Sequence, residues 1–196
     1  MDFLFLGNQL ALDFVNTRPV VNAEAVELLP DFGALLRWFQ AAGLLSASDV
    51  ATLQRKWRDP AELGKVLKKI LEFRELLRRE VSRLEKAEPI RKETISELNR
   101  LMAAHPMLTR VSSHGDKREL QSWFNPCQPG DLLAPLARSA SELLTQADMS
   151  RLRKCEVCVL HFVDVSKKGS RRWCSMKFCG NRAKVAAYAS RQRANR

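Results

Sequence analysis

The sequence lacks any hydrophobic run long enough to cross a membrane, and its opening residues do not predict an export signal. Its first sixteen residues are largely apolar, but they include Asp2, Gln9 and Asp13 and no basic segment of the kind that begins a secretion signal. The hydrophobic fraction of 45% and the charged fraction of 28% are typical of globular proteins. We therefore expect a cytoplasmic protein with reduced cysteines and no membrane partner.

Motifs for enzymatic chemistry are also missing. The sequence contains no phosphate-binding Walker loop, no dinucleotide-binding fingerprint and no nucleophile elbow. His105 and His114 do not suggest a catalytic pair, because they are well separated in sequence and lie beside turn-forming residues. The sequence therefore predicts a protein that is not an enzyme.

Acidic residues are nearly absent from the last quarter of the chain. Residues 151–196 contain thirteen Lys or Arg but only two acids, Glu156 and Asp164, whereas residues 1–150 contain twenty basic and twenty acidic residues. The formal net charge of +11 therefore comes entirely from the carboxy-terminal segment. A basic tail on a neutral body suggests that the tail binds a polyanion, although a solubilising terminus would have the same composition.

The 196 residues suffice for one ordinary domain and a small second one, and we place the boundary near residue 150, where the composition becomes basic. Before that boundary, apolar residues recur every three or four positions and predict a mainly α-helical body. Residues 107–124 instead alternate around His114-Gly115-Asp116 and predict one short β-hairpin. Helices are expected over residues 6–15, 32–42 (with Asp31 as N-cap and Gly43 as the stop), 46–59, 61–87, 91–103 and 131–145.

Four of the five cysteines lie close together in the basic segment. Two residues separate Cys155 from Cys158, four separate Cys174 from Cys179, and fifteen lie between the two pairs. Four thiolates on two short loops can surround one tetrahedral Zn²⁺, and because they complete its coordination the ion would be structural. A redox-active CxxC is the alternative, but it would not need the second pair. Cys127 is isolated and is expected to be buried.

The fifteen residues between the cysteine pairs are expected to form a β-hairpin over residues 160–173 that turns at Gly169. His161 could compete as a zinc ligand, but four thiols already complete the site, so we expect a partly exposed strand residue. A module this small cannot be stabilised by its own core, and zinc would supply the missing stability. Asn181 is a suitable N-cap for a helix that starts at Arg182.

Basic side chains surround this predicted zinc site and continue along the helix that follows it. At about 100° per residue, Arg182 and Arg193 share one side of that helix, whereas Lys184 and Arg191 lie near the opposite side, so no single basic stripe forms. Arg182 could either fix the zinc loops or bind phosphate. The alanine-rich helix is slim enough for a DNA major groove and equally able to pack against the body. The candidate nucleic-acid-binding residues are Arg171, Arg172, Lys177, Arg182, Lys184, Arg191 and Arg193.

The end of the first expected helix is unusually polar for a core segment. Asp13, Asn16, Thr17 and Arg18 could line a pocket for a small-molecule effector, with Trp38 as its wall. The body would then be a sensor. The simpler interpretation is that Asp13 and Asn16 cap neighbouring helices.

The carboxy-terminal segment resembles the CGNR zinc finger, which takes its name from the run Cys179-Gly180-Asn181-Arg182. The Phe-x-Asp element of that finger matches Phe162 and Asp164, and its Arg-Arg-Trp-Cys-Ser-Met element matches residues 171–176. The body resembles the ABATE domain that usually precedes this finger in stress-induced transcription regulators. The matching segments are LALDFVNT at residues 10–17 and LLRWFQAAGLL at residues 35–45.

The resemblance implies a bacterial, zinc-binding and DNA-binding transcription regulator, with double-stranded DNA as its partner. We accordingly expect a helical body followed by a small treble-clef-like zinc finger over residues 151–196. The alternative is a module that binds RNA or protein, in which zinc only shapes the tail. No heptad or symmetric motif indicates an oligomer, and the oligomeric state stays open.

Overall fold

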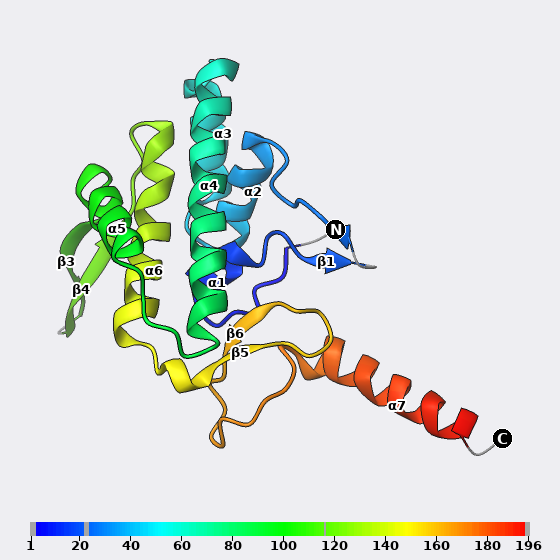
Figure 1. Ribbon diagram of the computed structural model, residues 1–196. Coiled ribbons are helices and arrows are strands. Elements are labelled where there is room, and N and C mark those ends of the chain that lie inside the picture. Colours follow the sequence, from blue (N-terminus) through cyan, green and yellow to red (C-terminus); the bar gives the residue numbers. More distant parts are fainter. Residues whose placement is uncertain (1–2, 22–23, 116, 195–196) are drawn as a thin grey trace.

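Figure 1 shows the computed structural model, which describes residues 3–21, 24–115 and 117–194. We call residues 3–150 the body and residues 151–194 the cysteine module. The helices are α1 (Leu10–Val15), α2 (Phe32–Ala41), α3 (Ala47–Lys56), α4 (Pro60–Leu84), α5 (Lys92–Ala104), α6 (Leu133–Gln146) and α7 (Asn181–Ala194). The strands of the described residues form three antiparallel pairs: β1 (Val20–Val21) with β2 (Glu24–Ala25), β3 (Leu108–His114) with β4 (Lys117–Trp123), and β5 (Leu152–Lys154) with β6 (His161–Val163). The mainly α-helical class is confirmed.

Side-chain caps fix the boundaries of several helices. Asp31 accepts a hydrogen bond from the backbone N–H of Ala34 at 2.6 Å and starts α2, and Gly43 has a positive φ of 73° just beyond its end, as predicted. Ser46 and Asp49 form a reciprocal capping box at the start of α3. These contacts satisfy N–H groups that a helix start leaves without partners.

The core of the body is built around α1, which contacts α4 and α6. Phe14 of α1 is fully buried, and its ring lies 5.7 Å from that of Trp38 in α2. On α4, Ile70 and Leu77 are buried on one face, as the periodicity of that segment predicted. A short helix in this central position places its last residues, Asn16 and Thr17, inside the molecule.

Three details of the body differ from the sequence predictions. The first helix begins at Leu10 and not near residue 6, because Asn8 has a positive φ of 58° that a helix does not allow. The body contains a small second strand pair, β1–β2, besides the predicted hairpin. The helix expected from residue 131 begins as a 3₁₀ turn, Pro129–Leu132, which leads into α6. The β3–β4 hairpin itself is confirmed, although Asp116 in its turn lies outside the described residues.

The cysteine module folds differently from the hairpin predicted at residues 160–173, and that prediction is wrong. Strand β6 pairs with β5, so that Lys154 faces His161 and the loop between them carries Cys155 and Cys158. The chain then turns at Asp164, which is fully buried and accepts hydrogen bonds from the backbone of later residues. Those hydrogen bonds replace the strand pairing that the sequence suggested.

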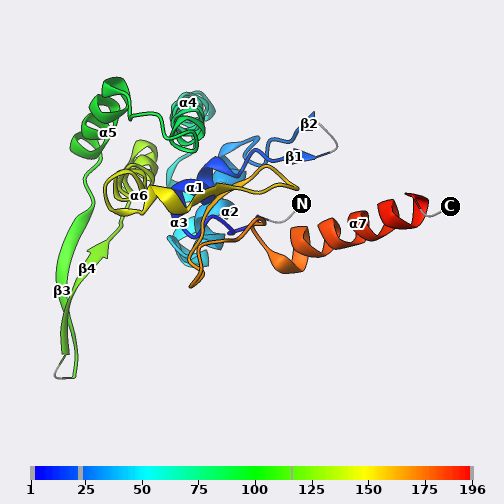
Figure 2. The ribbon, with the colours of Figure 1, turned by 60° about the horizontal axis from the view of Figure 1, so that its bottom comes forward.

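Helix α7 extends away from the rest of the molecule, as Figures 1 and 2 both show. The β3–β4 hairpin projects on the opposite side of the body. The four cysteines lie between the body and α7, close to the end of α1. The cysteine module therefore fixes the position of the first turn of α7.

Candidate metal centre

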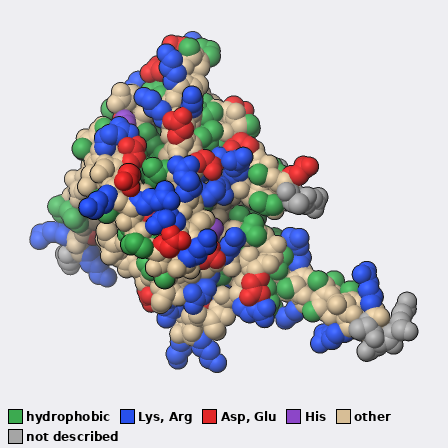
Figure 3. All heavy atoms as spheres, viewed as in Figure 1, with side chains coloured by type: hydrophobic (Ala, Val, Ile, Leu, Met, Phe, Trp, Pro, Cys, Tyr) green, Lys and Arg blue, Asp and Glu red, His purple; other side chains and the backbone are tan. Residues whose placement is uncertain are grey.

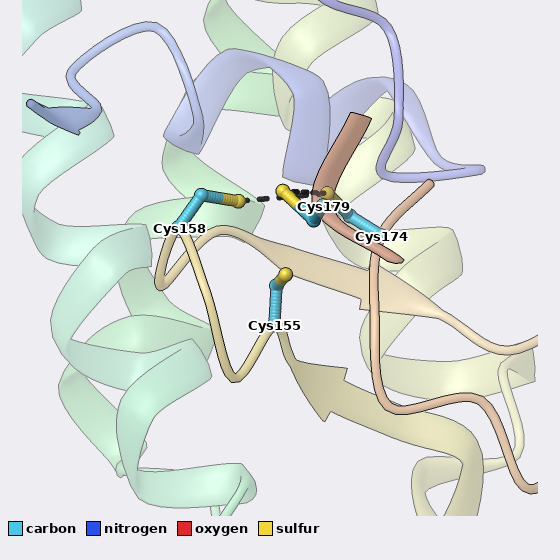
Figure 4. Close-up of side chains that lie close together, drawn as sticks. All are labelled: Cys155, Cys158, Cys174 and Cys179. Atoms are coloured by element: carbon cyan, nitrogen blue, oxygen red, sulfur yellow. Dashed lines mark hydrogen bonds between the residues drawn. The ribbon is translucent and has the colours of Figure 1, made fainter. Parts of the chain in front are cut away.

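The four cysteines of the cysteine module converge on one point (Figure 4). Their four Sγ atoms all lie within 4.8 Å of one another. The Sγ atom of Cys174 is 3.5 Å from that of Cys158 and 3.7 Å from that of Cys179. A tetrahedral Zn²⁺ with zinc–sulfur bonds of about 2.3 Å would require sulfur–sulfur distances of about 3.8 Å, so the donor set fits this ion in both chemistry and spacing.

Two elements hold the four sulfurs. Cys155 and Cys158 lie on the loop between β5 and β6, where the backbone N–H of Cys155 donates to the carbonyl of Leu160 at 2.8 Å. Cys174 and Cys179 bracket the start of a π-helical turn, Met176–Gly180, that continues into α7. A loop between two strands together with a helix start gives the treble-clef-like arrangement that the sequence predicted.

The cap of this helical turn is Ser175 and not Asn181, so the predicted N-cap is wrong. The Ser175 hydroxyl accepts a hydrogen bond from the N–H of Phe178 at 3.4 Å. Asn181 is already inside the helix and donates its side-chain amide to the carbonyl of Lys177 at 3.3 Å. The helical turn thus starts at Met176, six residues before the expected Arg182, and includes the zinc ligand Cys179.

Contacts within the cluster shift the pKa values of Cys158, Cys174 and Cys179 in different directions. The hydrogen bond from Cys174 lowers the pKa of Cys158 to about 5. The same hydrogen bond, together with burial, raises the pKa of Cys174, and burial raises that of Cys179 to about 12. The positive charge of Zn²⁺ favours the thiolate form of its cysteine ligands and opposes the effect of burial on Cys174 and Cys179. The four cysteines form a structural zinc site with no position left for a reacting water.

A layer of hydrogen bonds around this site is built by Asp164 and Arg171. Burial alone would raise the pKa of Asp164, but hydrogen bonds from the backbone of Arg171 and from Ser166 lower it to about 2. The Arg171 guanidinium donates to the carbonyl of Cys174 and lies 5.1 Å from the ring centroid of Phe162. Arg171 therefore has internal partners that orient a zinc ligand.

His161 and Cys127 do not lie where the sequence suggested. His161 is buried, not partly exposed, and its Nε2 atom is 3.2 Å from Glu85 at the end of α4. Its ring therefore contacts the body and is not a zinc ligand. Cys127 is exposed, not buried, because it lies in a surface turn whose backbone N–H donates to Asp131.

Asn16 joins the body to the cysteine module. Its side-chain amide donates to the carbonyl of His161 at 2.8 Å and accepts from the N–H of His161 at 3.0 Å. Nearby, the N–H of Val163 donates to the carbonyl of Gly7 at 2.9 Å, and the side chain of Asn8 donates to the carbonyl of Val163 at 2.8 Å. These four hydrogen bonds, together with the His161–Glu85 contact, attach strand β6 to the body.

Apolar contacts cross the same boundary. Leu6 of the body packs against the cluster formed by Phe162 and the buried cysteines. In the other direction, Leu152 and Val163 of the cysteine module belong to the core of the body. Leu6, near the amino terminus, therefore covers one side of the zinc site. The sequence had predicted that this residue lies in the first helix.

The residues predicted to bind an effector do not surround one cavity. Asn16 contacts His161, and Thr17 donates to the carbonyl of Phe14 at 2.7 Å and accepts from Arg74 at 2.9 Å. Trp38 is 1% exposed in the core. The simpler interpretation, in which Asp13 and Asn16 cap neighbouring helices, does not hold either, because Asn16 bonds to strand β6 and Asp13 to the backbone of Gly7.

Asp13 and Arg18, the other two, lie apart. Asp13 accepts a hydrogen bond from the N–H of Gly7 at 2.7 Å, and burial raises its pKa to about 6. Arg18 is on the surface, where its guanidinium lies 3.6 Å from Glu75. A hollow lined by Asp13 and one lined by Arg18 are separate features of the body.

The seven candidate nucleic-acid-binding residues fall into two groups. Arg171 has the internal partners described above, and Arg172 forms a two-pronged ion pair with Glu156, with distances of 2.8 and 2.6 Å. The others are exposed and form no ion pair with another described residue: Lys177, Arg182, Lys184, Arg191 and Arg193. Figure 3 shows basic side chains along the projecting helix.

Sequence reasoning missed Leu6, Asn8 and Glu85 as residues that hold the cysteine module. None of them belongs to a motif with a defined chemistry, and each contact joins residues more than seventy positions apart. In the sequence, the one indication of a contact between the body and the cysteine module was Asn16, a polar residue at the end of an otherwise apolar helix.

Comparison with known protein families agrees with this geometry. A family model described as "Putative stress-induced transcription regulator", ABATE, matches residues 8–147. A second model, described as the CGNR zinc finger, matches residues 151–192. No curated protein matches the chain. Among the described residues, no helix has the length and apolar character needed to span a membrane.

Proposed function

The chain belongs to the ABATE family and carries a CGNR zinc finger, and from this premise we propose that it is a transcription regulator that binds double-stranded DNA through α7. In this proposal the protein acts by binding and not as an enzyme. Zinc fixes the start of α7, and the helix supplies the contacts with DNA.

The observation that carries this proposal is the exposure of α7. From Asn181 to Arg193 every side chain is exposed except Ala183, which is partly exposed. An isolated helix of this length is only marginally stable in water, and this one buries no apolar face that would compensate. A partner that surrounds the helix would supply what the chain itself does not.

The positions of the basic residues favour a groove over a flat surface as the binding site. Arg182 and Arg193 lie on one side of α7, and Lys184 and Arg191 lie on the other. A helix about 10–12 Å wide fills a major groove about 12 Å wide, and phosphates line both edges of that groove. Basic residues on opposite sides of the helix can therefore contact both DNA strands.

Equilibrium binding to a duplex across a range of salt concentrations tests the proposal. The zinc-loaded protein should bind at low salt, and its affinity should fall steeply as salt is added, because phosphate contacts release counterions. Lys184→Ala and Arg191→Ala should each reduce the slope of log affinity against log salt by about one. Lys92→Ala, an exposed residue of α5 in the charge-balanced body, is the matched control and should not change the slope. Absence of duplex binding at low salt, or tighter binding to single-stranded RNA, would reject the proposal.

The family description also motivates the proposal that the protein responds to stress. Immunoprecipitation of the tagged protein with its genomic DNA, from stressed and unstressed cells, tests this part separately. We expect the protein to occupy defined chromosomal sites and the occupancy to change with stress. Unchanged occupancy would reject the stress response and leave the proposal of DNA binding standing.

A further inference from the structure

Apolar side chains lie on the surface of the turn that leads into α7, among the basic residues. Met176 is 47% exposed and Phe178 is 46% exposed, and Trp173 is partly exposed next to them in the sequence. Hydrophobic and basic side chains also lie side by side along the projecting helix (Figure 3). We call Trp173, Met176 and Phe178 the apolar tip. Large apolar side chains that stay exposed together mark a contact surface, whereas single ones need no explanation.

The apolar tip is held in place by the zinc module beneath it. A Cβ atom added to Gly180 would lie 2.4 Å from Sδ of Met176 and 3.3 Å from Cε3 of Trp173, so both side chains pack directly on the backbone of Gly180. The backbone of Phe178 is fixed by its hydrogen bond to Ser175, and Cys179 follows in the same turn. Side chains that are ordered before binding lose less conformational entropy when a partner covers them.

Positive charge flanks the apolar tip. The Lys177 ammonium lies 5.8 Å from the ring centroid of Phe178, and the Arg172 guanidinium lies 5.5 Å from that of Trp173. Nucleic acids offer both anionic phosphates and base rings on which apolar side chains can stack. A second copy of the chain is a poor match, because its cysteine module carries the same excess of positive charge.

We propose that Met176 and Phe178 contact the bases of the DNA duplex, between phosphate contacts made by Lys177 and by α7. This inference rests on the proposed function and adds a second kind of contact to it. Apolar side chains of this type insert partly between base pairs in many DNA-bending proteins. Insertion at one base step would partly unstack it and kink the duplex.

Salt-dependent binding of Phe178→Ala to a duplex carrying 2-aminopurine tests the base contact. We expect this variant to bind about fivefold or more weakly at every salt concentration, with the salt slope of the wild type, because it loses stacking and no phosphate contact. Lys177→Ala should instead reduce the slope by about one. Wild-type protein should increase the 2-aminopurine fluorescence, and Phe178→Ala should reduce that increase. Leu120→Ala is the matched control, since Leu120 is 75% exposed on the distant β3–β4 hairpin.

Zinc content and the circular dichroism spectrum show whether each variant keeps its fold. Met176→Ala provides a second, independent removal of apolar surface and should weaken binding in the same way. If wild-type protein binds the duplex while both variants bind within twofold of it, the base contact is rejected and the proposed function stands. A reduced salt slope for Phe178→Ala would also reject it. If wild-type protein binds no duplex, the proposed function itself fails.

Discussion

Asn16 and Asp13 show how single polar residues of a buried helix connect the two parts of this molecule. Asn16 satisfies both backbone groups of His161, and Asp13 holds the N–H of Gly7, whose carbonyl in turn accepts from Val163. Buried polar groups are costly without partners, so each of these contacts stabilises the position of β6. Their role is to position the cysteine module against the body.

Asn16→Ala should lower the free energy of unfolding by about 2 kcal/mol, because it leaves two buried backbone groups of His161 without partners. We expect amide hydrogen exchange in β6 to accelerate while the zinc content stays unchanged. Asn125→Ala, an exposed residue of a surface turn, is the matched control. Unchanged exchange in β6 would show that Asn16 does not hold the cysteine module.

The pH dependence of stability should reveal Asp13. Its pKa in the folded protein is about 6, above the ordinary value of 3.8, so the folded state binds the proton more tightly than the unfolded state does. The stability that this group contributes is full below about pH 4 and is lost as the pH rises through 6. Between pH 7 and pH 5, wild-type protein should therefore gain about 1 kcal/mol relative to Asp13→Asn, which keeps an acceptor for Gly7. If the difference in unfolding free energy between the two proteins is the same at pH 5 and pH 7, this assignment is wrong.

At the scale of elements, α7 differs from the other helices. Helices such as α2 begin at a capping side chain and bury one face, so their sequence and their packing agree. Helix α7 is exposed on all sides, and its first turn is fixed only through the π-helical turn that carries Cys179. We therefore attribute the order of α7 to its amino-terminal attachment and, in the proposed complex, to DNA.

Amide hydrogen exchange along α7 should report this attachment. In the free, zinc-loaded protein we expect amides after the first turn of α7 to exchange rapidly, whereas those of the buried α1 are protected. Addition of a bound duplex should slow exchange throughout α7. Strong protection of the whole helix without DNA would mean that another contact stabilises it.

The sequence could predict elements that are specified by local signals, but not those that depend on contacts between distant segments. The periodicity of α4 and the capping residues of α2 and α3 are local signals, and those elements were predicted nearly to their ends. The spacing of the cysteines identified all four zinc ligands, because zinc chemistry restricts the possible ligand sets. The pairing of β5 with β6 and the burial of His161 depend on how the module meets the body, and no local pattern encodes that.

At the scale of the whole molecule, the metal site and the body share apolar contacts. Leu6 of the body covers the zinc cluster, while Leu152 and Val163 of the cysteine module fill the core of the body. A small module that borrows apolar contacts in this way should not be independent of its neighbour.

Removal of zinc by a chelator should therefore destabilise more than the cysteine module. We expect a lower unfolding midpoint for the entire chain, loss of protection in β6, and exposure of apolar surface around Leu6. Most of the helical signal should remain, because α2 to α6 bury their own core. An unchanged unfolding midpoint would show that the body and the cysteine module are energetically separate.

The central claim is that one zinc ion, held by Cys155, Cys158, Cys174 and Cys179, gives the basic carboxy-terminal segment its shape. Native mass spectrometry of the purified protein tests it most directly by counting bound metal. We predict one zinc per chain for wild-type protein and for Cys127→Ser, whose cysteine is exposed and outside the cluster, and loss of stoichiometric zinc for Cys174→Ser. Wild-type protein without stoichiometric zinc, or Cys174→Ser that retains it with unchanged affinity, would contradict the account.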